Sequence, residues 1–159
     1  MQKLIDLSRS LESLAGGLGK IAFDWLEQNE DYLISTNQEQ MYSGKTAEDV
    51  PITPTYSQDP YFDNPIEALA YAKYKDAWSH PDRDWDTPNL FINGNWYYKH
   101  IKVVRFKPVE MVFSVRHPMG REIWAKYPTT LGITPDNMGE INMDFILPAV
   151  IKGIKKQFS

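Results

Sequence analysis

Prolines divide this chain more sharply than any other feature. Four of them fall between residues 51 and 65, at Pro51, Pro54, Pro60 and Pro65. A proline fixes its own φ angle, has no amide hydrogen to donate, and biases the residue before it away from helix. Neither a long helix nor a paired central strand can therefore run through this stretch. We expect an irregular, proline-rich arm over residues 43–65, after a helical N-terminal segment, residues 1–40.

The N-terminal segment carries an apolar seam. Its apolar residues recur at alternating steps of three and four: Leu4, Leu7, Leu11, Leu14, Leu18, Ile21 and Trp25. That spacing places them on one face of a helix. Glycines at 16, 17 and 19 each cost a helix interior about 1 kcal/mol against alanine. We therefore expect two helical pieces, the second from about Leu18 to Gln40. The seam packs either on the domain's own sheet or against a helix of another subunit.

Two further helices are marked by their caps. Asn64-Pro65 supplies a cap followed by proline at the first helical position, and this helix should run to about Ser79. Thr134-Pro135-Asp136 opens the terminal helix in the same way, with an acidic residue in the first turn. Pro148 falls inside that terminal helix, so we expect it to kink or split the helix.

Between these two helices, alternating apolar and polar residues predict a β-hairpin at about 101–116. The preceding stretch, residues 93–100, is either a hairpin turn or a short helix. The chain therefore reads as one α+β domain, residues 1–159, with N-terminal helices and a small antiparallel β-sheet packed by a C-terminal helix. Residues 66–159 form its α+β core. The expected centre of that core is apolar: Met111, Phe113, Val115, Phe145, Ile146 and Val150.

Composition excludes several classes of protein. The chain has no cysteine, which removes disulfides and thiolate metal sites. Acidic residues interrupt the N-terminus, so it is not expected to be a signal peptide, and no window approaches the ~20 apolar residues of a membrane helix. We expect a soluble protein.

Charge is spread unevenly along the chain. Residues 1–100 carry 8 Lys and Arg against 16 Asp and Glu, whereas residues 101–159 carry 9 against 5. Either the exposed faces of the two parts simply differ in charge, or the acidic part of one subunit meets the basic part of another. The net charge of −4 argues against a general nucleic-acid binder. The aromatic group around Trp85 and Trp96 has acidic neighbours that repel phosphate, so we expect it in a core or an interface.

One loop resembles a metal site only in part. Its members are His80, Asp82, Asp84 and Asp86, and the alternate aspartates match the start of a calcium-binding loop. The sixth position of that motif is Thr87 rather than glycine, and the twelfth is Asn93 rather than glutamate. No nucleophile-elbow or phosphate-loop pattern is present either. We therefore expect no metal, no cofactor and no catalysis.

Four short motifs occur in an order that is similar to a known family. They are the turn Tyr42-Ser43-Gly44-Lys45, the extended piece Ile52-Thr53-Pro54-Thr55-Tyr56, the element Gly94-Asn95-Trp96-Tyr97, and the loop Leu131-Gly132-Ile133-Thr134. In this order, over residues 37–158, the chain resembles neck and tail-completion proteins of long-tailed phages of gut bacteria. It departs from them at Ile92-Asn93, where they tend to have a Thr or Asp-Thr before the glycine. It also has the acidic, aromatic stretch 59–63 where they are often basic.

The resemblance implies a structural protein that is not an enzyme. It would be a virion component, made in the host bacterial cytoplasm, that forms a homo-oligomeric head–tail connector (neck) or tail-completion ring beside other virion proteins. No membrane is involved, and nucleic acid would make only passing contact in a ring lumen. The alternative is a phage-encoded protein-binding module that acts on a host protein. The expected interface residues come from the seam and the arm: Leu4, Leu7, Leu11, Leu14, Tyr56, Tyr61 and Phe62.

Overall fold

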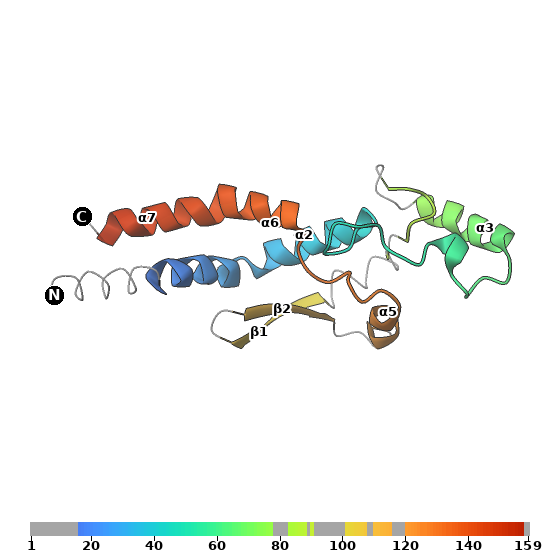
Figure 1. Cartoon of the computed structure of the whole chain (residues 1–159), viewed down its shortest axis with the longest axis horizontal. Coiled ribbons are helices and arrows are strands. Elements are labelled where there is room, and N and C mark those ends of the chain that lie inside the picture. Colours follow the sequence, from blue (N-terminus) through green and yellow to red (C-terminus); the bar gives the residue numbers. More distant parts are fainter. Residues whose placement is uncertain are drawn as a thin grey trace, which may run out of the picture. The chain divides into compact units, whose positions relative to one another are not determined.

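The computed structural model describes residues 16–77, 83–88, 90, 101–107, 110–115 and 120–157. These residues are mostly helical (Figure 1). They belong to two compact units. One, the paired-helix unit, comprises Met1–Glu30 and Met138–Ser159, and the other, the central unit, comprises Asp31–Asn137. No helix in the described ranges is long and apolar enough to cross a membrane.

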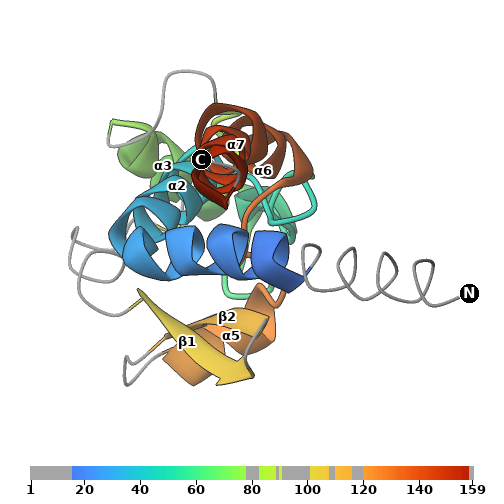
Figure 2. The same cartoon turned by 90° about the vertical axis from the view of Figure 1, so that its left-hand side faces the viewer.

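The paired-helix unit joins the two ends of the chain. Residues 16–28 are helical, and they lie beside the terminal helix α7 (Leu147–Gln157) (Figures 1 and 2). Trp25 stacks on Phe145, with ring centroids 5.3 Å apart. Ile21 lies against Gly153, where an added β-carbon would overlap the Ile21 side chain. Because contacts advance along one helix as they recede along the other, the two helices are antiparallel.

The terminal helix is continuous, so Pro148 does not split it, and the departure from α-helical geometry lies in the turn just before the proline. Helix α6 (Pro135–Ile141) leads through a π-helical turn, η2 (Asn142–Ile146), straight into α7. The Leu147 amide donates to the Asn142 carbonyl, five residues back. Proline has no amide hydrogen for the normal helical pattern, and the wider π turn just before it accommodates that loss.

The second predicted helical piece of the N-terminal segment is not continuous. The expected single piece from Leu18 to Gln40 is interrupted by a turn at Asn29, where α2 (Glu30–Tyr42) follows at once. The Asn29 side chain donates to the Trp25 carbonyl at 2.7 Å, so it competes with the backbone hydrogen bonding of a continuous helix. The glycines, by contrast, are helical in the described part from residue 16 onward.

The central unit contains the remaining elements. They are η1 (Tyr56–Gln58), α3 (Pro65–Asp76), β1 (Ile101–Lys107), β2 (Glu110–Val115) and α5 (Gly120–Lys126). The two strands pair antiparallel with Val103 opposite Phe113, and the register is irregular between Arg105 and Lys107. The predicted α+β class is therefore confirmed only in outline. Helices dominate, and β structure beyond isolated bridges is limited, in the described residues, to this hairpin.

The apolar core differs from the predicted one. Its buried members are Met41, Ile52, Leu90, Ile123 and Tyr127, and Ile34, Phe113, Val115 and Leu131 pack against them. Phe113 and Val115 were expected there. Phe145 was also expected there, but it is 40% exposed and stacks on Trp25 in the paired-helix unit. Phe145 was misassigned because a helical stripe shows which residues face a neighbour but not which neighbour they face.

Two amide side chains on α2 anchor the loop that precedes the terminal helix. Asn37 donates to the carbonyls of Thr130 and Gly132 at 2.9 and 2.7 Å. Gln40 donates to the Gly132 carbonyl at 2.9 Å and accepts a hydrogen bond from the Thr134 amide at 2.9 Å. Both amide side chains belong to buried residues. The loop's buried backbone groups thus find partners on α2.

The turn at Gly44 joins α2 to the arm. Gly44 has a φ angle of +77°, which favours glycine, and a β-carbon there would lie 2.8 Å from the Thr87 methyl group and 3.0 Å from Cγ of Arg83. Its carbonyl accepts the amide of Ile52 at 2.9 Å. Ile52 is fully buried. The first part of the arm is therefore folded into the core.

Replacing Gly44 by alanine should destabilise the fold. The left-handed backbone and the contact with Thr87 together should lower the free energy of unfolding by about 1–3 kcal/mol. The matched control is Gly139→Ala, because Gly139 lies inside α6 with open space around it. The control should be neutral or more stable by up to about 1 kcal/mol. Urea denaturation of both variants measures the difference, and equal midpoints would show that the turn is not constrained.

Candidate functional site

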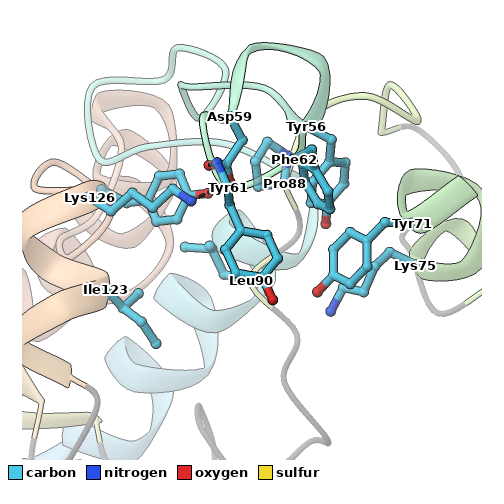
Figure 3. A pocket seen from close by; sticks show the side chains of 11 residues that line it. Tyr56, Asp59, Tyr61, Phe62, Tyr71, Lys75, Pro88, Leu90, Ile123 and Lys126 are labelled. Carbon is cyan, nitrogen blue, oxygen red and sulfur yellow. Dashed lines mark hydrogen bonds and ion pairs between the residues drawn. The ribbon is translucent and has the colours of Figure 1, made fainter. Parts of the chain in front are cut away.

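A pocket of about 370 Å³ lies in the central unit (Figure 3). The arm, α3 and α5 each contribute side chains to it. Its lining consists of Tyr56, Asp59, Tyr61, Phe62, Tyr71, Lys75, Pro88, Leu90, Ile123, Lys126 and Tyr127. Most of these residues are aromatic or aliphatic, and three carry charge. A concave, mainly apolar surface with a few polar groups is the usual form of a small-ligand site.

Aromatic rings in mutual contact form one wall. Tyr56 meets Tyr71 edge to face, with centroids 5.3 Å apart and planes at 78°. Phe62 lies 5.3 Å from Tyr71 and also 5.3 Å from Tyr61. Tyr56 is buried, whereas Tyr61 is 81% exposed and stands at the rim. The arm and α3 thus share a wall of interlocking rings that leaves one tyrosine open to solvent.

An ion pair ties the arm to α5. Lys126, in the last turn of α5, contacts the Asp59 carboxylate. The same carboxylate accepts the Tyr61 amide at 3.0 Å. The Asp59 side chain is buried, so its charge has left water and needs these two donors. Asp59 therefore fixes both the turn that carries Tyr61 and the distance between the arm and α5.

Lys75 brings a second cation into the pocket. It lies on the face of α3 that also buries Ala68 and Ala72. Burial lowers the pKa of the Lys75 ammonium from its ordinary 10.5 to about 8, and the nearby positive charge of Arg83 acts in the same direction. At neutral pH the group is still mainly charged. The pocket thus holds a cation that is costly to keep away from water.

Burial also keeps two phenols of the pocket neutral. It is the main cause that raises the pKa of Tyr71, and neighbouring acidic groups add to the effect. The pKa of Tyr127 is raised further for the same reason, with Asp59 as the next contributor. Both hydroxyl groups therefore remain protonated at physiological pH and are able to donate hydrogen bonds.

A buried arginine shapes the loop that closes one side of the pocket. The Arg83 guanidinium donates to the carbonyls of Asp84 and Thr87, the first at 2.7 Å, and pairs with Asp76 at 3.2 Å. Its side chain is fully buried. A fork of donors suits several carbonyls at once. Arg83 thus holds the loop that delivers Pro88 to the lining.

Asp86, one of the two described aspartates of the acidic loop, binds the arm. Asp86 accepts the Ser57 amide at 2.8 Å and the Ser57 hydroxyl at 2.6 Å. Burial opposes ionisation of Asp86, but the hydrogen bonds from Ser57 and Thr55 outweigh it and lower the pKa. Asp84 accepts the Asp86 amide at 2.9 Å. Within the described ranges no three His, Asp or Glu side chains converge on a metal-sized space, and His80 and Asp82 lie outside those ranges.

The predicted interface residues fall into two groups. Tyr56, Tyr61 and Phe62 all reach the pocket, although Tyr56 is buried and has little surface to offer a partner. The four leucines, Leu4, Leu7, Leu11 and Leu14, lie outside the described residues. Lys75 and Lys126 were missed. The signal for Lys75 was its position three residues after Ala72 and seven after Ala68, on the small-residue face of α3.

Comparison with models of protein families, with curated proteins and with solved structures found no match. Any inference about function that goes beyond the sequence motifs therefore rests on the fold and the pocket.

Stability should reveal the buried lysine through its pH dependence. The folded-state pKa of Lys75, about 8, lies below 10.5. Between those values the unfolded state holds more protons, so the cost of burying the charged Lys75 falls and the free energy of unfolding rises as pH rises through that window. Between about pH 7 and about pH 9.5 the wild type should gain melting temperature relative to Lys75→Met, which lacks the group. A difference between the two proteins that stays constant with pH would contradict the buried, charged Lys75.

Proposed function

We propose that this protein is a non-catalytic structural subunit of a phage virion, with several copies in a ring at the head–tail junction or at the tail end. The ordered motifs of residues 37–158 suggest the class. Two exposed apolar surfaces, one on each compact unit, carry the argument for assembly. Each surface is described below by its own residues.

The first surface, the terminal stripe, runs along the C-terminal helix. It consists of Met143, Leu147 and Ile151, which recur every four residues and are all exposed, Met143 by 65%. Phe145 and Gly153 meet the neighbouring helix instead. Residues four apart lie on one face of a helix. The terminal stripe is thus an apolar face that remains open within the described chain.

The second surface, the α3 face, reverses the usual pattern of a surface helix. Large apolar residues Ile66, Leu69 and Tyr74 are exposed, Ile66 by 78%, while the buried face carries alanines and Lys75. A helix of a monomer normally turns its large apolar residues inward. Contiguous exposed apolar residues mark protein–protein contacts.

A ring needs two different surfaces on every subunit. Head-to-tail contacts join one patch of a subunit to another patch of the next, and a ring results when the rotation closes. The terminal stripe and the α3 face differ in composition and belong to different units, which is the pattern such a subunit requires. We propose the leucines at 4, 7, 11 and 14, with Tyr61 and Phe62, as further contacts. The site of action would then be the virion, after synthesis in the host bacterial cytoplasm.

Substitution in the terminal stripe tests assembly. Ile151→Glu places a charge on an exposed apolar contact, so it should leave the melting temperature close to wild type and abolish the oligomer. Ile151→Met keeps the surface apolar and should still assemble. Sedimentation velocity of the three proteins measures the size of the assembly.

Mass spectrometry of purified particles tests the location. Peptides of this chain should be present in virions of the phage that encodes it, at a copy number consistent with one ring. A protein that stays monomeric and is missing from purified particles would contradict the proposal. Such a result would favour the alternative, a module that binds a host protein.

A further inference from the structure

The terminal stripe and the α3 face match each other in length and in the order of the charges beside them. We propose that the terminal stripe of one subunit docks on the α3 face of a second copy of this chain, with the two helices antiparallel. The contact rests on the ring proposed above and deepens it, because it names the two surfaces that meet between neighbouring subunits.

The two surfaces have the same length. The terminal stripe runs from Met143 to Ile151, and the α3 face runs from Ile66 to Tyr74. A helix rises about 1.5 Å per residue, so each surface extends about 12 Å along its axis. Their ends are open, since Met143 is 65% and Tyr74 is 66% exposed. Each surface can therefore cover the other from end to end.

Charge is ordered along the terminal stripe. Asp144 follows Met143 at the N-terminal end, and Lys152 follows Ile151 at the C-terminal end. Glu140, one helical turn before Asp144, adds to the acidic end. All three charged residues are exposed. The terminal stripe thus has an acidic beginning and a basic end.

The α3 face has the same order of charges. Glu67 follows Ile66 at the N-terminal end, and Lys73 precedes Tyr74 at the C-terminal end. Both charged residues are exposed. Neither takes part in the ion pairs found among the described residues. The charges of the α3 face are therefore open to a partner.

The two charge orders select an antiparallel contact. Antiparallel helices place Lys152 of one copy by Glu67 of the next, and Asp144 by Lys73. Parallel helices would instead bring the two acids together and the two lysines together. Opposite charges across a contact fix its orientation, and like charges oppose it.

The apolar residues favour docking of the two different surfaces. In the antiparallel register Met143 of one copy meets Tyr74 of the next, and a thioether against an aromatic ring is a favourable contact. Pairing of two stripes, or of two α3 faces, would have complementary charges as well but would lack this contact. Such pairing is two-fold symmetric and stops at a dimer. A stripe on an α3 face leaves one surface of each kind open, so further subunits can join.

Mixing two blocked variants tests the contact. Ile151→Glu blocks the terminal stripe, and Ile66→Glu blocks the α3 face. Both positions are exposed, so each variant should keep a melting temperature near that of the wild type and should be monomeric alone. An equimolar mixture should form a heterodimer, because each variant retains the surface that the other lacks. Sedimentation velocity measures the three samples, and Tyr74→Glu, a second block of the α3 face, should behave as Ile66→Glu does.

Charge reversal in the same mixture tests the orientation. Glu67→Lys, on the copy with the intact α3 face, should weaken the heterodimer about three- to tenfold, because it places a lysine by Lys152. Adding Lys152→Glu to the other copy should restore the affinity. The control is Glu48→Lys, which changes net charge equally at an exposed position outside α3 and should have no effect. Isothermal titration calorimetry measures the affinities.

Three results would overturn the docking. They are a mixture that stays monomeric, a blocked variant that dimerises alone, and a Glu67→Lys defect that Lys152→Glu does not rescue. The second result would indicate that like surfaces pair. If the wild type still forms an oligomer, these results leave the proposed ring standing with other contacts. A wild type that is monomeric in sedimentation would contradict the ring itself.

Discussion

The central unit depends on a buried exchange of hydrogen bonds between α2 and the loop before the terminal helix. Asn37 and Gln40 reach residues that lie 92 to 97 positions further along the chain. The hydrogen bond to the Thr130 carbonyl is buried and those to the Gly132 carbonyl are part-buried. An unsatisfied buried group costs about 1–3 kcal/mol. The two amides therefore fix where the loop lies, and through Thr134 they fix where the terminal helix begins.

The pocket follows from this anchoring. Met41, one residue after Gln40, starts the core that contains Ile52 of the arm. The arm is then held twice more, by Asp86 on Ser57 and by Lys126 on Asp59. Rings from the arm and α3 are left facing α5 across the pocket. The arm, which was expected to supply interface residues, thus also forms a wall of the pocket through Tyr56, Asp59 and Phe62.

Contacts between residues that are close in the sequence were predictable, and contacts between distant residues were not. Asn64 caps α3 and Thr134 caps the terminal helix as their cap patterns predicted. The 101–116 hairpin also follows from alternation. Polar Gln40 gave no sign that it would be buried, because its partners come from a loop distant in sequence. The role of Lys75 was hidden for the same reason.

Hydrogen exchange at the Thr134 amide tests the central constraint most directly. This amide donates to the Gln40 side chain at 2.9 Å inside a buried site, although it lies at the end of an irregular loop. If the α2–loop bonds hold the unit together, Thr134 should exchange only through global unfolding, at the rate of the slowest amides in α2. Exchange as fast as that of solvent-exposed amides would show that the loop opens independently and that the anchoring is not the constraint described.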